Sequence, residues 1–262
     1  MRALLLVALA LPLTGCDSQM TLQEVCNTHP EYCEDVPLTG WCVKERSEVI
    51  WKRYEHNDKD PNSIYNELLS LENFVNCIEK AVKIENREQA KERESARVES
   101  YIAAQTSLTN IQEKTQNDAS PYLSFYHWTR FHNRQALNRF LDAESQGKLD
   151  SATLKGFAAS YYSQSNPKRA TGYLLETLPE LPQPAVDAFL DLSKLFMDQR
   201  NNEQAYIFAK MAAISNPEMV NPQRLKMLSL SSGQKQSLLD EQAQQRLTQL
   251  AEGKFSAKSI KM

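Results

Sequence analysis

Apolar residues recur at helical spacing along most of the chain. Residues 40–56 and residues 61–82 each place apolar side chains on one face, which predicts two amphipathic helices. Asp60 or its neighbour is positioned to cap the second helix, and Pro61 to occupy its first turn. The pattern therefore predicts an antiparallel hairpin with its turn near residue 58.

The stretch after this hairpin is dense in charges of both signs. Glu88 and Lys91 are three residues apart, as are Glu94 and Arg97, so each pair can interact on a helix surface. We interpret the stretch as a solvated helix or connector. Residues 61–116 then form one long helical segment that completes the hairpin and leads out of it.

The second half of the chain repeats itself. Alanine recurs at Ala136, Ala170 and Ala205, at spacings of 34 and 35 residues. A large residue followed by a small one recurs with the same spacings, at Leu123-Ser124, Phe157-Ala158 and Leu192-Ser193. One helix–turn–helix unit cannot bury its own apolar face, so repeats of this length are expected to stack.

This pattern resembles the tetratricopeptide repeat, a helix–turn–helix unit with a period of about 34 residues. We expect three such repeats over residues 117–217, capping helices over residues 218–252 and a flexible tail over residues 253–262. The alternative is a plain helical bundle whose spacing is coincidental.

Composition supports an all-α fold. The chain of 262 residues has only 7 glycines, and strong helix formers dominate it. The predicted architecture is a disulfide-stapled helical hairpin followed by a tetratricopeptide-like α-solenoid. The 30 basic and 33 acidic residues give a formal net charge of −3, so no nucleic-acid partner is expected.

The N-terminus carries the pattern of a secretory signal. Arg2 precedes an apolar run over residues 3–12, which is shorter than the ~20 residues that span a bilayer. The following Leu-Thr-Gly-Cys sequence resembles a bacterial lipobox. It implies that residues 1–15 are a cleaved signal peptide and that Cys16 receives lipid, which anchors the chain in the membrane. An ordinary signal followed by a chance cysteine is the alternative.

Residues 16–60 form the lipidated N-terminus and the cysteine-rich first helix. In the lipoproteins that the chain resembles, aspartate after the lipid cysteine often causes retention in the inner membrane. Asp17 therefore favours the inner over the outer membrane, with the chain facing the periplasm.

Four further cysteines, Cys26, Cys33, Cys42 and Cys77, predict two disulfides in an oxidising compartment. Cys42 lies 16 residues before the expected turn and Cys77 lies 19 residues after it, so the two sulfurs reach similar heights on the hairpin. This favours Cys42–Cys77, with Cys26–Cys33 closing a small loop. A zinc site that uses cysteines and His29 is the rival, but the spacing fits no common zinc pattern.

The whole arrangement resembles an uncharacterised family of lipoproteins of Gram-negative bacteria, classed as a domain of unknown function. The resemblance rests on the four cysteines, on the RSEVIWKRYE sequence after Cys42 and on the helical repeats that follow. It implies no assigned activity.

Candidate chemistry is sparse. The chain has no HExxH, no GxSxG and no phosphate-binding glycine loop. His127 and His132 are five residues apart, unlike an i,i+4 metal pair, and aromatic residues surround them. We therefore expect no catalytic residues, no metal site and no cofactor, and predict that the protein is not an enzyme.

The repeats predict a binding groove instead. In tetratricopeptide proteins, which the repeats resemble, the first helices of successive units line a concave groove that holds a peptide. Carried over by position, the groove residues are Phe125, Trp128, Lys155, Ala159, Tyr162, Leu190, Lys194 and Met197. Aromatic anchors beside a few charges are typical of interface hot spots.

We therefore expect a lipid-anchored periplasmic adaptor that binds another envelope protein or a peptide. Two alternatives remain open at this point. One is an envelope enzyme, acting on peptidoglycan, that uses the repeats as a scaffold. The other is a purely structural lipoprotein.

Overall fold

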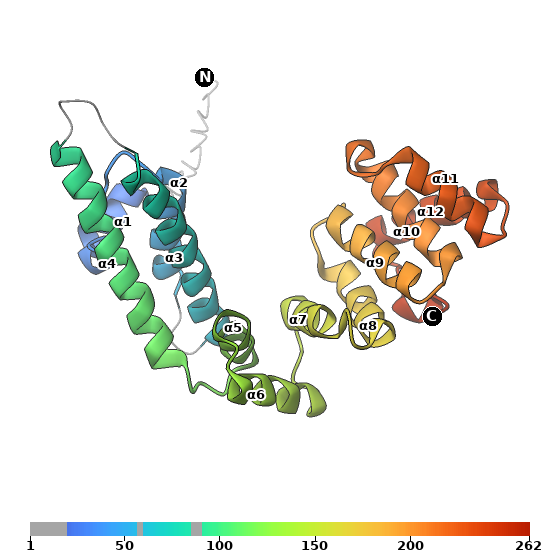
Figure 1. Cartoon of the computed structure of the whole chain (residues 1–262), viewed down its shortest axis with the longest axis horizontal. Coiled ribbons are helices and arrows are strands. Elements are labelled where there is room, and N and C mark those ends of the chain that lie inside the picture. The colour runs from blue at the N-terminus through green and yellow to red at the C-terminus, as the bar shows by residue number, and fades with distance from the viewer. Residues whose placement is uncertain (1–19, 57–59, 85–90) are drawn as a thin grey trace, which may run out of the picture. The chain divides into compact units, whose positions relative to one another are not determined.

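The computed structural model describes residues 20–56, 60–84 and 91–262. Within these ranges, every element of regular secondary structure is a helix, which confirms the all-α prediction (Figure 1). The chain divides after Thr115 into two compact units, called here the N-terminal unit and the C-terminal unit. None of the helices in the described part of the chain is long and apolar enough to cross a membrane.

The N-terminal unit is built on three long helices. Its elements are α1 (Leu22–Thr28), the 3-10 helix η1 (Pro30–Tyr32), α2 (Val43–Tyr54), α3 (Pro61–Val82) and α4 (Lys91–Thr115). Helix α2 packs against α3, and α3 packs against α4 (Figure 1). Side chains with no exposed surface form its core: Val49, Ile50, Leu68, Leu71, Phe74 and Ile78.

Local sequence signals set where these helices begin. The side chain of Asp60 accepts a hydrogen bond from the Asn62 N–H, and Pro61 is the first residue of α3, as the sequence predicted. Thr21 and Glu24 form a capping box at the start of α1. These contacts satisfy backbone donors that have no partner inside the helix.

Two disulfides close the N-terminal unit, with the connectivity that the hairpin geometry favoured. Cys26 bonds to Cys33, and their Cα atoms are 5.7 Å apart. Cys42 bonds to Cys77 across α2 and α3, with Cα atoms 5.9 Å apart. The second bridge therefore holds the two helices of the hairpin together.

The charged stretch is helical from Lys91 onward, which agrees with one of its two interpretations, but the helix is not solvated on all sides. Helix α4 packs along α3 and buries Ser100 within the stretch and Ala104 and Leu108 beyond it. Arg97 has no exposed surface, and its Nη2 donates a 3.0 Å hydrogen bond to the carbonyl oxygen of Ile84. Glu88 lies outside the described residues.

The C-terminal unit consists of helices that pack in consecutive pairs, α5 with α6, α7 with α8 and α9 with α10. Its α-helices are α5 (Pro121–Phe131), α6 (Arg134–Ser145), α7 (Ala152–Tyr162), α8 (Pro167–Thr177), α9 (Val186–Asp198), α10 (Asn202–Ser215), α11 (Pro222–Ser232) and α12 (Gln236–Ala251). Short 3-10 helices follow α8, α10 and α12: η2 (Leu178–Glu180), η3 (Pro217–Met219) and η4 (Ala257–Ser259). Helices α11 and α12 pack on α10.

The repeated small residues lie at the helix contacts. Ala136, Ala170 and Ala205 lie in the first turn of the second helix of each pair and have no exposed surface. Ser124, Ala158 and Ser193, the small members of the repeated pairs, are likewise fully buried. Small side chains there let neighbouring helices approach closely.

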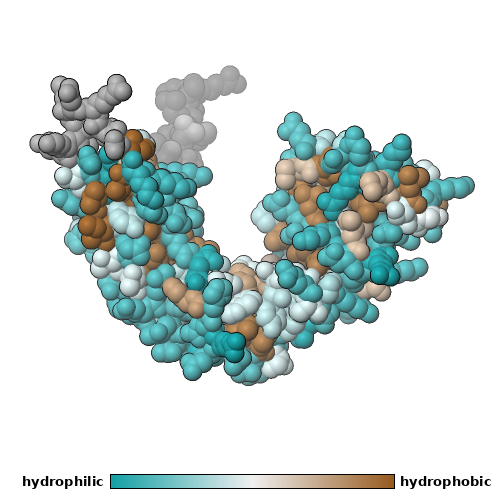
Figure 2. All heavy atoms as spheres, viewed as in Figure 1, coloured by the Kyte–Doolittle hydropathy of each residue, from teal (hydrophilic) through white to brown (hydrophobic). Residues whose placement is uncertain are grey.

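Residues 253–262, which were expected to form a flexible tail, pack against the C-terminal unit in this structure. Phe255 and Ile260 are buried in the core shared by α8 to α12. The Asn201 side chain also donates a 3.2 Å hydrogen bond to the carbonyl oxygen of Lys261. The face drawn in Figure 2 is mostly hydrophilic, with apolar residues gathered in places on each unit.

Candidate functional site

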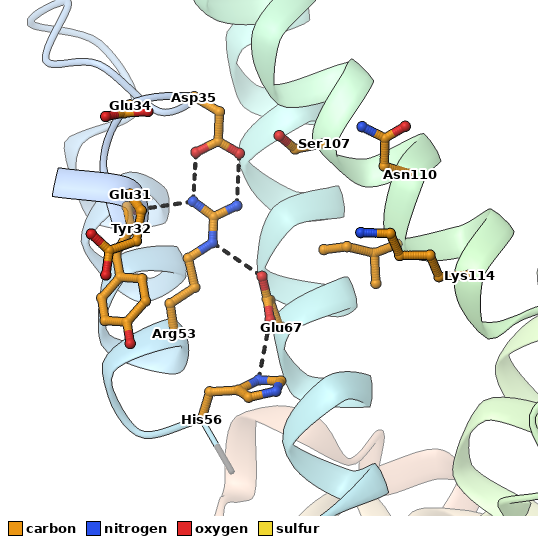
Figure 3. Close-up of a pocket in the computed structure, with 11 residues that line it drawn as sticks. Glu31, Tyr32, Glu34, Asp35, Arg53, His56, Glu67, Ser107, Asn110 and Lys114 are labelled. Atoms are coloured by element: carbon orange, nitrogen blue, oxygen red, sulfur yellow. Dashed lines mark hydrogen bonds and ion pairs between the residues drawn. The ribbon is translucent and has the colours of Figure 1, made fainter. Parts of the chain in front are cut away.

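A polar cleft of about 820 Å³ opens in the N-terminal unit between η1, α2 and α3 on one side and α4 on the other (Figure 3). Two groups of side chains line it. The η1–α2–α3 wall contributes Glu31, Tyr32, Glu34, Asp35, Arg53, His56 and Glu67, and α4 contributes Ser107, Asn110, Ile111 and Lys114.

Arg53 organises the first wall of this cleft. Its Nη1 and Nη2 donate parallel hydrogen bonds to the two carboxylate oxygens of Asp35, at 2.5 and 2.7 Å. Its Nε lies 3.1 Å from Glu67 Oε1, and Nη1 also donates to the carbonyl oxygen of Tyr32 at 2.9 Å. On the far side of Glu67, Oε2 lies 3.2 Å from Nδ1 of His56.

These contacts fix the charge state of Arg53. Burial alone would lower the pKa of its guanidinium, but the hydrogen bonds and negative charges of Asp35 and Glu67 outweigh burial and raise the pKa. Arg53 therefore stays protonated and joins α2 to both η1 and α3. A permanently charged arginine of this kind positions other groups and does not transfer protons.

The α4 wall has a different character. Ser107, Asn110 and Lys114 lie on one face of α4 and extend toward the first wall (Figure 3). Within residues 20–56, 60–84 and 91–262, neither Lys114 nor Glu34 forms an ion pair. The cleft thus carries unpaired charges of opposite sign on its opposite walls.

A second cleft, of about 560 Å³, lies in the C-terminal unit among α7, α8 and α9. Small and apolar groups line part of it, including Gly156, Ala159, Leu174 and Leu195. Its charged residues all come from α9: Asp191, Lys194 and Asp198.

Asp191 has an altered affinity for protons. Partial burial against the cleft and the nearby charge of Asp187 raise the pKa of its carboxyl group, and Lys194 opposes them. Two carboxylates against one ammonium leave the charged side of this cleft acidic.

Only some of the expected groove residues meet at this cleft. Ala159 and Lys194 line it. Phe125 is buried, with its ring stacked on Phe157 at a centroid distance of 4.1 Å. Phe125, which was expected to line a groove, therefore fills the space between α5 and α7 in this structure.

Trp128 and Tyr162 are half-buried and have partners within the unit. The Trp128 ring packs edge-on against Phe125 and Tyr161, at 5.4 and 5.2 Å. The Tyr162 hydroxyl donates a 2.8 Å hydrogen bond to Glu144, a buried carboxylate that also contacts Tyr173 and Arg169. Burial and the Glu144 hydrogen bond raise the pKa of Tyr162 to about 12, so the hydroxyl keeps its proton at neutral pH.

The remaining expected groove residues are dispersed. Lys155 is engaged in an ion pair with Glu176 at 3.4 Å. Leu190 packs on the core of α8 to α12. Met197 is 40% exposed, and its sulfur lies 3.4 Å from Nη2 of Arg224.

Comparison with known proteins places the chain in a family. A family model described as a protein of unknown function, DUF2989, matches residues 13–210. The chain belongs to the DUF2989 family. No curated protein and no solved structure matches it.

Cys16 falls within the region that the family model matches. Both Cys16 and the expected signal peptide lie outside the residues that the structure describes. The lipidation of Cys16 therefore stays a prediction. Among the described histidines, His127 is buried against Tyr126 and Phe131, and His132 ends α5 in the left-handed conformation. Burial, together with the charge of Arg139, lowers the pKa of His127.

One possible metal-binding group occurs in the described part of this DUF2989 chain. It consists of Cys42, Glu45 and Cys77. Both sulfurs of this group form the disulfide between α2 and α3, so they are not free to bind a metal ion.

Sequence reasoning missed the Arg53 network, although a signal for it exists. Arg53 is four residues after Val49 and three after Ile50, on the buried face of α2. Glu67 adjoins Leu68 and is four residues before Leu71, on the buried side of α3. Opposite charges on the apolar faces of two neighbouring helices indicate a buried ion pair.

Proposed function

We propose that this DUF2989 chain is a lipid-anchored periplasmic adaptor whose C-terminal unit holds a peptide segment of another envelope protein. The observation that carries the proposal is the cleft among α7, α8 and α9, where Ala159 and Lys194 occupy positions expected to line a groove. The peptide is the proposed occupant because the first helices of two successive pairs, α7 and α9, both line the cleft.

The anchor in this proposal is lipid on Cys16, in the inner membrane of a Gram-negative cell. Two disulfides in the N-terminal unit agree with an oxidising compartment. From Cys16 to Leu22, the first residue of α1, an extended chain spans at most ~20 Å. The N-terminal unit would then lie close to the membrane surface.

The scaffold in this proposal is a tetratricopeptide-like solenoid. Its support is the equivalence of the helix pairs, since the same repeated positions are buried in each. Such stacks use the first helices of successive pairs to form one continuous surface. Helices α7 and α9 are the first helices of the second and third pairs, and both line the cleft.

The charge of the cleft selects the peptide. Asp191 and Asp198 outnumber Lys194, so a lysine or arginine of the peptide would gain a carboxylate partner there. The apolar groups Ala159 and Leu195 would contact the neighbouring apolar side chains of the peptide. We therefore expect an extended segment that carries a basic residue beside apolar ones.

Site-specific crosslinking in cells followed by peptide binding tests the proposal. A photoreactive amino acid at Ser160, in the cleft, is expected to crosslink a defined segment of an envelope protein, and the same group at Ser145, on α6, is not. A synthetic peptide of that segment should bind the purified protein in fluorescence anisotropy. Asp191→Lys should weaken its binding at least about tenfold, since charge-assisted hydrogen bonds contribute about 1.5–3 kcal/mol.

The matched control is Asp142→Lys, an exposed charge reversal on α6 that lines neither cleft. The proposal is overturned if Ser160 and Ser145 give the same crosslinks, or if Asp191→Lys and Asp142→Lys bind the peptide equally well. Circular dichroism of both variants checks that the helices persist.

The anchor has its own test. Cys16→Ser should leave a precursor that is neither cleaved nor lipidated. Normal processing of this variant, with partitioning into the detergent phase, would refute the lipidation of Cys16. The peptide-binding part of the proposal would still depend on the crosslinking result.

A further inference from the structure

Some charged side chains of the polar cleft in the N-terminal unit take no part in the ion pairs that hold its first wall together. Arg53, Asp35 and Glu67 satisfy one another within the first wall. Glu34 and Lys114 line the same cleft, and each lacks an ion-pair partner among the residues that the structure describes. Two unlike charges on opposite walls of one cleft are complementary to a ligand that carries both signs.

The two walls offer complementary groups to such a ligand. The carboxylates of Glu31 and Glu34 present acceptors to an ammonium group, beside the Asp35 carboxylate that Arg53 holds (Figure 3). On α4, the Lys114 ammonium and the Asn110 amide can donate to an anionic group, and the Ser107 hydroxyl lies on the same wall.

The acidic wall is held rigid before any ligand arrives. The Cys26–Cys33 disulfide closes the loop that contains η1. Arg53 then ties this loop to α2 through Asp35 and through the carbonyl oxygen of Tyr32. A preorganised site loses less conformational entropy on binding than a mobile one.

Size narrows the choice of ligand. A cleft of about 820 Å³ is in the range of sites for small molecules. An amino acid or a short peptide carries an ammonium and a carboxylate at its two ends and fits within that range. Ile111 and Tyr32 leave apolar surface for its side chains.

We propose that this cleft binds a small zwitterion of the amino-acid type, a free amino acid or a short peptide. Its ammonium group meets Glu34 and the neighbouring carboxylates, and its carboxylate meets Lys114 and Asn110. The site lies in the N-terminal unit, so the proposal does not depend on the peptide-binding cleft of the C-terminal unit.

Isothermal titration calorimetry on the full-length chain in detergent tests the proposal. The probes are L-alanyl-L-alanine, its N-acetyl derivative, its C-terminal amide and phosphoethanolamine. The dipeptide is expected to bind, and either blocked derivative to bind at least about tenfold more weakly, since each loses one charge-assisted contact.

Charge-neutralising variants connect the binding to the cleft. Glu34→Gln and Lys114→Gln should each weaken dipeptide binding about tenfold or more. Both residues are exposed, so the fold should tolerate the changes. The matched controls are Glu48→Gln and Lys44→Gln, exposed residues of α2 outside the cleft, which should leave the affinity unchanged.

Three results would overturn the proposal. The first is no heat of binding from the dipeptide at millimolar concentration. The second is equal affinity in the cleft variants and their controls. The third is tighter binding of phosphoethanolamine than of the dipeptide, which would assign the cleft to a lipid headgroup instead of a peptide.

Discussion

The guanidinium of Arg53 and the carboxylate of Asp35 lie face to face, joined by two parallel hydrogen bonds between residues 18 positions apart in the chain. Their side chains are 9% and 16% exposed, so water scarcely screens the pair. Because Arg53 also contacts Glu67, this one cation links the disulfide loop, α2 and α3. The polar cleft takes its shape from that link.

Removing this cation should destabilise the N-terminal unit strongly. Arg53→Met leaves Asp35 and Glu67 partly buried without a counter-charge, which costs about 3–5 kcal/mol for a buried pair. Urea denaturation followed by circular dichroism measures the loss of unfolding free energy.

Lys52→Met is the matched control for this change. Lys52 precedes Arg53 and pairs with Glu55 on the surface, where an ion pair contributes less than about 1 kcal/mol. Equal losses in Lys52→Met and Arg53→Met would show that the Arg53 network does not support the fold.

The two disulfides should differ in their contribution to stability. Cys42–Cys77 spans 35 residues and Cys26–Cys33 spans 7. In the chain-entropy account, the longer loop contributes about 4 kcal/mol and the shorter one about 2 kcal/mol. We therefore expect Cys42→Ala with Cys77→Ala to lower the melting temperature more than Cys26→Ala with Cys33→Ala.

Differential scanning calorimetry of the two double variants measures this difference. The unmodified protein under reducing conditions provides the reference in which both bridges are open. A smaller effect from the Cys42–Cys77 pair would contradict the prediction and indicate that the short loop carries more of the fold.

The features that sequence reasoning predicted correctly depend on local capping signals, on helix lengths or on the period of a repeat. Asp60 and Pro61 act on the helix that begins beside them. The pairing of Cys42 with Cys77 follows from the lengths of two helices and the place of one turn. The recurrence of Ala136 and its equivalents depends only on a period.

The features that it missed depend on which side chains meet when helices pack together. From the sequence alone, a charged residue such as Arg97 is expected on the surface. Its burial becomes understandable only once its hydrogen bond to the carbonyl oxygen of Ile84 is known. Phe125 occurs where repeat proteins expose groove residues, but the Phe157 ring lies against it. The period of a repeat does not show whether an aromatic side chain at a repeated position faces a groove or packs against the next helix.

Acid should weaken the C-terminal unit through His127. Burial and the charge of Arg139 lower the pKa of this histidine in the folded chain, whereas a histidine in an unfolded chain titrates near 6.5. Between the lowered pKa and about 6.5, the unfolded chain binds a proton that the folded chain does not. The contribution is therefore fully present above about pH 6.5 and is lost as the pH falls below that value.

We expect His127→Gln to flatten the pH dependence of the unfolding free energy between about pH 7 and about pH 5, by up to about 1.4 kcal/mol per pH unit. His132→Asn is the control, because His132 is exposed and adopts a left-handed conformation that asparagine also accepts. Parallel pH profiles for His127→Gln and the unmodified protein would rule out this origin of acid sensitivity.

The C-terminal residues should stabilise the fold, although the sequence analysis expected a flexible tail there. Phe255 is 8% exposed and Ile260 is 7% exposed, and both join the core formed by α8 to α12. Phenylalanine-to-alanine changes in a core cost about 3–5 kcal/mol, so we expect Phe255→Ala to lower the unfolding free energy by about 3 kcal/mol or more. Met262→Ala, at a residue that is 54% exposed, should change the unfolding free energy by less than about 0.5 kcal/mol.

Amide hydrogen exchange gives an independent readout of the same prediction. The Ile260 N–H donates to the carbonyl oxygen of Ala257 and should be protected in the unmodified chain but not in Phe255→Ala. If Phe255→Ala and Met262→Ala were equally stable and the Ile260 amide exchanged freely in both, the tail would be frayed in solution and the core of α8 to α12 would be complete without it.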